Sequence, residues 1–283
     1  MSIGTTTRPT GRRGLRRLPR RLRVFGRLLA LNTSLTFIYR GDFFLLQLSN
    51  VVVPLISLLV WRAALASGAD LGVDQAYLDS YFLSVSVVAM ATASWSAPFL
   101  AAAIRNGDLN RSLLRPISPH VDLVANNLGE KVVKVVLLLP VIAIVVWLLP
   151  GRPPVPGSPS SWLLGVVAVV LAALLAIFFD IARASLAFWF EDISGFTIAT
   201  DLIRTVLSGA VVPLALMPAG LAAVMAWQPF RFFVSFPIEV AFEQTLDGVA
   251  VGFAQQVGWL VIMVVSGLGL WRLGLRRYSA AGV

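Results

Sequence analysis

The chain has 283 residues, of which 58% are hydrophobic and only 13% charged, and its mean hydropathy is +0.83. Because soluble domains carry about 25% charged residues, this composition excludes an ordinary soluble domain and indicates an integral membrane protein. The sequence contains no cysteine, which excludes thiol catalysis, disulfides and cysteine-ligated metals. Its single histidine, His120, is expected at the surface, so we predict no metal site.

The first 40 residues are strongly basic and contain ten arginines. We expect residues 1–12 to form a disordered basic tail. Over residues 13–40 apolar side chains recur at alternating spacings of three and four, which predicts an amphipathic helix lying in the headgroup region with its arginines near anionic lipid. The apolar stripe consists of Leu15, Leu18, Leu22, Phe25 and Leu29. A disordered tail throughout is the alternative.

Six segments are long and apolar enough to cross a hydrocarbon core, which takes about 20 residues. They cover residues 43–66, 79–103, 130–150, 162–183, 196–217 and 252–274. The predicted fold is therefore an all-α membrane protein, with six transmembrane helices in a domain over residues 41–283 that follows the interfacial helix.

Basic residues are distributed unevenly between the connections. The connection 67–78 has none and 151–161 has only Arg152, whereas 104–134 and the C-terminal end hold eight. These eight are Arg105, Arg111, Arg115, Lys131, Lys134, Arg272, Arg276 and Arg277. Since basic connections stay in the cytoplasm, both termini are predicted to be cytoplasmic. The positive charge then reflects topology, and we expect no nucleic-acid partner.

Residues 104–119 form a short polar island between the second and third spans. The spacing of its leucines and isoleucines predicts a small amphipathic helix that begins near Gly107 and Asp108 and is stopped by Pro116 and Pro119. A basic amphipathic helix between two spans needs a partner surface, so we predict a docking element.

Polar side chains recur within the spans. In the first span Gln47, Asn50 and Ser57 share a helical face with Pro54 and Trp61. Polar atoms at membrane depth usually face protein or a cavity. We hypothesise that a set of such residues lines a pathway or a dimer interface: Gln47, Asn50, Ser57, Ser84, Ser94, Thr205 and Ser208. Hydrogen bonding between helices of one subunit is the alternative.

The fourth and fifth spans are predicted to form a tight cytoplasmic hairpin. Asp180 and Arg183 lie one helical turn apart and can pair; Asp201 and Arg204 repeat this spacing, which permits a network of charge pairs. The pair is either structural or a gate latch. After the fifth span, the proline-rich apolar stretch 213–237 predicts short re-entrant or outer-leaflet helices. Alternatively, residues 218–228 complete a longer fifth helix.

Motifs for catalysis are missing from the sequence. A nucleotide-binding P-loop needs Lys followed by Ser or Thr, but Lys131 and Lys134 are each followed by Val. We therefore expect no ATP hydrolysis by this chain and no enzymatic activity. Two other classes compete with an ATP-driven transporter. A secondary transporter tends to have internal repeats and acidic residues at mid-membrane, and a lipid-modifying enzyme needs a cluster of carboxylates or histidines.

Several motifs together resemble one family. The polar island has the pattern Gly-x-Leu-x-x-x-Leu-Leu-x-Pro, and Phe188-Trp189, Pro213 to Pro218 and Pro229-Phe230 follow in order. With six spans and both termini inside, the chain resembles the permease subunit of bacterial type-2 ABC transporters over nearly all residues after 30.

This resemblance implies a coupling helix that rests in a cleft of a separate ATPase subunit. Its contact candidates are Gly107, Asp108, Leu109, Arg111, Leu113, Leu114 and Arg115. Many relatives have Glu where this chain has Asn110. The helix over 13–40 resembles the connecting helix along the inner leaflet, and 213–237 resembles the outer re-entrant pair that closes the pathway.

The resemblance also implies the assembly. Two permeases, identical or related, would form a dimer over two ATPases in the bacterial plasma membrane, among membrane lipids, and ATP-driven closure would shear the spans. ATP and Mg would be bound by the partner subunit, with no cofactor in this chain. The implied cargo is an amphipathic drug, natural product or lipid, moved outward.

Overall fold

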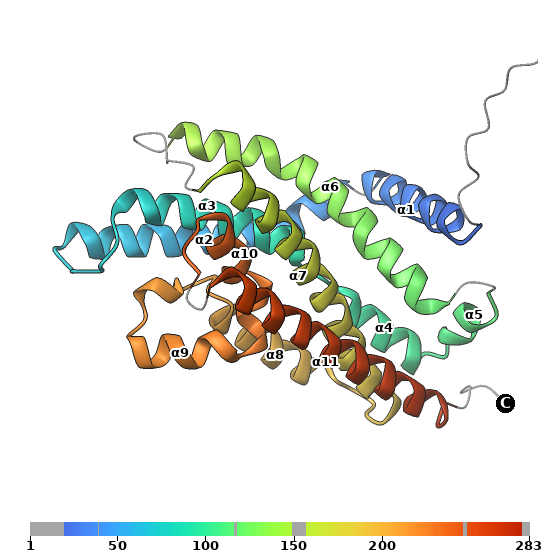
Figure 1. The fold of residues 1–283 in the computed structure, drawn as a ribbon. Coiled ribbons are helices and arrows are strands. Elements are labelled where there is room, and N and C mark those ends of the chain that lie inside the picture. The colour runs from blue at the N-terminus through green and yellow to red at the C-terminus, as the bar shows by residue number, and fades with distance from the viewer. Residues whose placement is uncertain (1–19, 39, 116–117, 149–156, 246–247, 279–283) are drawn as a thin grey trace, which may run out of the picture.

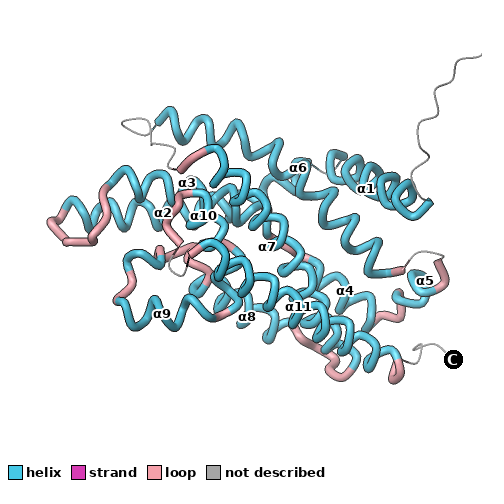
Figure 2. Tube along the Cα trace, in the orientation of Figure 1, coloured by secondary structure: helices cyan, strands magenta, loops and turns pink. Residues whose placement is uncertain are grey.

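The computed structural model describes residues 20–38, 40–115, 118–148, 157–245 and 248–278. Within them the chain forms helices joined by loops and no strand (Figure 2). The predicted tail over 1–12 and the beginning of the predicted amphipathic helix lie outside the described residues.

The N-terminal helix α1 (Arg20–Ile38) packs along α6 (Pro119–Leu148). The two backbones come close at Gly129, where an added Cβ would lie 3.0 Å from the backbone nitrogen of Thr33. The hydroxyl of Thr33 also donates a hydrogen bond to the carbonyl oxygen of Gly129, at 3.3 Å. The predicted interfacial helix therefore rests on a neighbouring helix of the same chain.

The predicted second span is interrupted. Helix α2 (Arg40–Ala66) is followed by α3 (Gln75–Thr92) and, after a break at residues 93–95, by α4 (Ser96–Arg105). The segment predicted over 79–103 lies within a candidate span, Gln75–Arg105, but this span is not one continuous helix. Pro98 explains the break, because its ring cannot coexist with a helical carbonyl four residues earlier and it has no N–H to donate.

Helix α7 (Pro159–Ser185) occupies the middle of the bundle, where it packs against α3, α4 and α10 (Ser235–Ala241) and most extensively against α11 (Val249–Leu275). Small buried residues permit these close contacts. They include Gly165, Ala168, Ala172 and Ala176. After α7, the short helix η1 (Leu186–Phe188) and a turn lead into α8 (Ser194–Leu207), which gives the predicted hairpin.

The predicted fifth span is shorter than expected. A single helix over 196–217 is wrong, because α8 ends after 14 residues at Leu207. Gly209 follows with a φ of +85°, the left-handed conformation that commonly ends a helix. The alternative in which 218–228 extends this helix also fails. The chain instead forms separate short helices: η2 (Leu214–Leu216), α9 (Ala219–Trp227), η3 (Pro229–Phe233) and α10.

The connections gather at two ends of the bundle. Helix α1, the short helix α5 (Leu109–Leu113) and the C-terminal end of α11 lie at one end, and α9 and the turn between α2 and α3 lie at the other (Figure 1). The connections that carry the most positive charge in the sequence are thus on the same side of the molecule.

Within the described residues, three helical segments are long and apolar enough to cross a membrane. These are Gln75–Arg105, which includes the break, Pro159–Phe188 and Val249–Leu275; a shorter apolar helix covers Val51–Ala66. The chain is therefore an all-helical, multi-pass membrane protein. The count of six spans stays a prediction.

Candidate functional site: a polar pocket beside a broken helix

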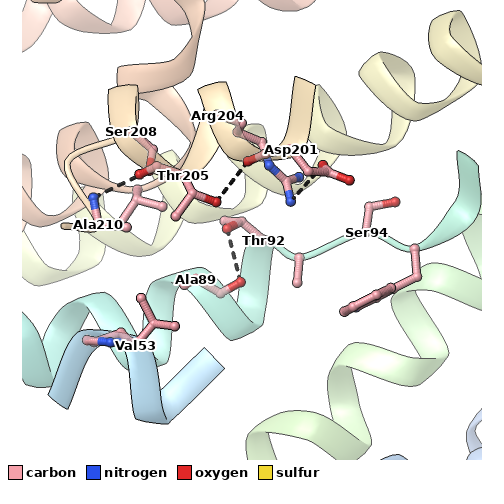
Figure 3. A pocket seen from close by; sticks show the side chains of 13 residues that line it. Val53, Ala89, Thr92, Ser94, Asp201, Arg204, Thr205, Ser208 and Ala210 are labelled. Carbon is pink, nitrogen blue, oxygen red and sulfur yellow. Dashed lines mark hydrogen bonds and ion pairs between the residues drawn. The ribbon is translucent and has the colours of Figure 1, made fainter. Parts of the chain in front are cut away.

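A pocket of about 280 Å³ lies between α2, the α3–α4 break and α8 (Figure 3). It brings together residues that the sequence proposed for two different roles, Ser94, Thr205 and Ser208 for a pathway and Asp201 and Arg204 for charge pairs. The rest of its wall is formed by Val53, Pro54, Ala89, Thr92, Ala93, Trp95, Ala210 and Val234. The pocket therefore offers hydroxyl and charged groups within an otherwise apolar wall.

Other pathway candidates lie elsewhere. Ser57 is buried on α2 and Ser84 is half-buried on α3, and neither lines the pocket. The side chains of Gln47 and Asn50 lie outside the described residues. On the same face of α2, the indole nitrogen of Trp61 donates to the carbonyl of Val211, at 3.0 Å, so this position links α2 to the segment after α8.

The four charged residues within helices α7 and α8 of the hairpin form one network. Arg183 pairs with Asp180 on its own helix and, at 2.9 Å, with Asp201 on α8. Arg204 reaches the same oxygen of Asp201 at 3.3 Å. The Asp180 side chain is fully buried, whereas that of Asp201 is 44% exposed. The network therefore runs from the interior of the bundle to the wall of the pocket.

Asp180 also binds the beginning of α4. Its Oδ2 accepts hydrogen bonds from the hydroxyl of Ser94 at 2.6 Å, the N–H of Ser96 at 2.9 Å and the N–H of Ala97 at 3.3 Å. The first N–H groups of a helix have no partner within that helix, and negative charge near them is stabilising. Asp180 thus caps α4 from a different helix.

Two residues of α6 also donate hydrogen bonds to the segment at the break. The ammonium of Lys131 donates to the carbonyl of Ala93 at 2.6 Å, and the amide of Asn127 donates to the hydroxyls of Ser94 at 2.9 Å and Ser96 at 3.1 Å. Since backbone groups in a membrane cannot rely on water, these contacts supply partners that the interrupted helix lacks.

Sequence reasoning missed this role of α6. It counted Lys131 and Lys134 with the basic connection 104–134, but both side chains are buried within α6, and Lys134 pairs with Glu130. The uneven distribution of basic residues between the connections, from which the orientation was predicted, therefore depends on the arginines. The spacing of Asn127, Lys131 and Lys134 by four and three residues, which aligns them on one helical face, is the signal that could have revealed their role.

The polar island forms α5, as the leucine spacing predicts, with Gly107 at a φ of +80° just before it. The first and last of its three leucines differ sharply in exposure. Leu109 is 1% exposed and packs with Ile104 and Trp271, whereas Leu114 is 87% exposed. Leu109 therefore belongs to the core instead of to a contact surface. Other candidates point outward: Asp108, Arg111, Leu113 and Arg115 are exposed, and Gly107 is partly so.

His120 lies at the start of α6, beside this helix. It is half-buried instead of fully exposed, and its ring centre is 4.8 Å from that of Trp271 in an edge-to-face contact. Burial, followed by the nearby positive charge of Arg272, lowers the pKa of the imidazole below its usual 6.5. His120 thus belongs to the packing that holds α5.

Long apolar helices around a polar pocket, with an exposed helical turn at one end, define a multi-pass helical membrane protein. Residues 75–282, well over half of the chain, match the model of the family described as "ABC-2 family transporter protein". The chain belongs to the ABC-2 transporter family, and the resemblance seen in its motifs is confirmed. It is the membrane permease of an ABC transporter, whose ATPase activity lies in separate partner subunits. No match was found among curated proteins or among solved structures.

Proposed function

We propose that this permease exports an amphipathic compound across the bacterial plasma membrane, driven by ATPase subunits that bind ATP and Mg and dock on α5. One observation carries the proposal: Arg111 of α5 and Leu114, the residue just after it, are exposed to solvent, while Leu109 fixes the helix to the bundle. An exposed leucine beside basic side chains fits an apolar cleft with an acidic rim on a partner.

The arrangement of the connections supports an orientation with both termini in the cytoplasm. Arg105, Arg111 and Arg115 surround α5, and the end of α11 carries Arg272 and Arg276 at the same end of the bundle (Figure 1). Basic segments next to spans remain on the cytoplasmic side, where ATP is available. On this side the arginine-rich α1 would contact anionic lipid headgroups.

The pocket supports a pathway shared with a second permease. Its walls come from α2 and α8, whose outward faces carry exposed apolar residues such as Ile56, Ile203 and Val206. A second subunit against these faces would enclose the pocket. Apolar walls with a few hydroxyls and one charge pair suit an amphipathic cargo.

The coupling is tested by Leu114→Ser in the permease purified with its ATPase subunit. We expect this variant to lose the association and the stimulation of ATP hydrolysis by the permease. Leu163→Ser is the matched control, since Leu163 is also well exposed but lies on α7 near the opposite end. Unchanged association and stimulation in Leu114→Ser would refute docking at α5.

The dimer is tested with single cysteines, because the natural chain has none. Val206→Cys on α8 should form a disulfide between two permeases under mild oxidation, and Val170→Cys, equally exposed on α7, should not. Equal crosslinking at the two positions would argue against this interface.

A related but different second permease would appear as a second band in the purified complex. Transport that depends on a proton gradient and needs no ATPase would instead favour a secondary transporter.

A further inference from the structure

Groups from two other helices bind both sides of the interruption between α3 and α4. Asp180 of α7 accepts the N–H groups of Ser96 and Ala97 on the α4 side. Lys131 of α6 donates to the carbonyl of Ala93 on the α3 side. Unpaired polar groups at membrane depth cost several kcal/mol each, so these two side chains stabilise one geometry of the break.

Helix α4 and helix α5 are joined by a hydrogen-bonded turn. The N–H of Asn106 donates to Ala102 at 2.9 Å, and the N–H of Asn110 donates to Gly107 at 3.2 Å, so hydrogen bonds continue through the turn between them. Ile104 of α4 and Leu109 of α5 lie in one buried cluster. We expect a displacement of α5 to be passed to α4 through this hydrogen-bonded turn.

The other end of α4 lies at the wall of the pocket. Ala93, Ser94 and Trp95 form both the break and part of the pocket lining. Figure 3 shows the chain leaving its helix between Thr92 and Ser94, on the side of the pocket opposite Asp201 and Arg204. A tilt of α4 about the break would change the distance between these two walls.

We propose that Asp180 and Lys131 are positioning residues for coupling. They hold the two ends of the interrupted helix, so that α4 and α5 turn about residues 93–95 as a single lever and pass movement from the ATPase to the pocket. That the ATPase supplies this movement depends on the proposed function. That Asp180 and Lys131 fix the geometry of the break does not depend on it.

The holding of the break is tested in the permease alone. Because the chain has no cysteine, Val87→Cys on α3 and Phe99→Cys on α4, both exposed positions, can carry spin labels whose separation reports the angle across the break. We expect a narrow distance distribution in the otherwise natural chain. Asp180→Ala should lose this narrow peak, and Lys131→Met, which removes the contact on the other side, should broaden it.

Asp201→Asn is the matched control, since it removes a carboxylate of the same network that makes no hydrogen bond or ion pair with residues 93–97, and it should retain the peak. If Asp180→Ala does not fold, Lys131→Met and Ser94→Ala provide the same test. Narrow distributions in every variant that folds would overturn the proposal.

The lever is tested in the complex with the ATPase subunit. Trapping with ATP and vanadate should shift the Val87–Phe99 label distance in the natural background, and the shift should be reduced in Lys131→Met. A label at Ser112 of α5 that moves relative to the ATPase while the Val87–Phe99 distance stays constant would overturn the lever and leave the proposed function standing. An α5 that never contacts the ATPase would instead refute the proposed function.

Discussion

The carboxylate of Asp180 accepts a hydrogen bond from the backbone N–H of Ser96, 2.9 Å away, at the first residue of α4. The two residues are 84 positions apart in the sequence. Ser and Asp usually cap a helix from the residue just before it, but here Trp95 occupies that position and contributes no side-chain cap. A distant aspartate supplies the missing acceptor and so ties α7 to this break. Among the candidate membrane spans of the described residues, only Gln75–Arg105 contains such a break.

Truncation to alanine should lower the free energy of unfolding much more at Leu109 than at Leu114. Leu109→Ala removes a fully buried side chain from the cluster with Ile104 and Trp271, so it should lower the free energy of unfolding by about 2–5 kcal/mol. Leu114→Ala removes an exposed side chain and should change it by less than about 0.5 kcal/mol. Thermal unfolding of the purified permease in detergent compares the two. Equal effects would contradict the different burial of these leucines.

Gly157 should tolerate alanine much less well than Gly248 does. Both have positive φ angles, +87° and +81°, so alanine costs about 1–2 kcal/mol at either position. At Gly157 an added Cβ would also collide with the carbonyl oxygen of Ala241, whereas at Gly248 it meets open space. We expect this collision to lower the free energy of unfolding of Gly157→Ala by about a further 1–3 kcal/mol. The difference in unfolding free energy between the variants measures the collision alone, and no difference would refute it.

The ion pair between Arg231 and Glu239 is buried, with a 2.6 Å contact. Arg231→Met would leave a buried carboxylate without its partner and should cost about 3–5 kcal/mol. Arg231→Met combined with Glu239→Leu removes both charges and should restore part of that loss. The recovery is incomplete because Arg231 also donates to the carbonyl of Ala226 at 3.2 Å. A double variant less stable than Arg231→Met would show that the pair is not the source of the cost.

Stability should decrease in acid through His120. Its folded pKa is lowered by burial and by Arg272, so below the usual value of 6.5 the unfolded chain binds a proton that the folded chain does not. The contribution of the neutral His120 side chain to the free energy of unfolding is complete above pH 6.5 and is lost as the pH falls toward the lowered pKa. Unfolding temperatures measured between about pH 7.5 and pH 5.5 should fall more for the natural chain than for His120→Phe.

The chain has only one histidine, so its imidazole resonances can be assigned without ambiguity. Their titration by NMR should give a midpoint below 6.5. A midpoint at or above that value would contradict the burial of His120 against Trp271.

Part of the site could be predicted from local sequence. The spacing of Asp180, Arg183, Asp201 and Arg204 suggested a network across a hairpin, and ion pairs join these residues because helical periodicity places three-residue neighbours on one face. The leucine spacing of α5 similarly predicted a helix with a buried side. In each case the pattern depends on contacts within about one helical turn.

Contacts between distant helices were not predictable in this way. The functions of Lys131 and Asn127 depend on which helix packs against the end of α3, and a count of basic residues gave Lys131 the wrong environment. The break itself had a local signal in Pro98, but hydropathy averaged over the segment concealed it. The early end of α8 likewise depended on Gly209, whose carbonyl accepts a hydrogen bond from the hydroxyl of Tyr81 at 3.0 Å.

Hydropathy and helical periodicity are properties of neighbouring residues, so the amino-acid order was enough to identify a helical membrane protein without a nucleotide-binding motif. The order of its short motifs also indicated the family, which the match over residues 75–282 confirmed. The packing of the helices was needed to show that Ser94, Thr205 and Asp201 share a pocket and that Asp180 and Lys131 hold the two sides of a broken helix. The physical reason is that backbone groups freed by the break must find partners inside the bundle, and the packing of α6 and α7 determines which side chains reach them.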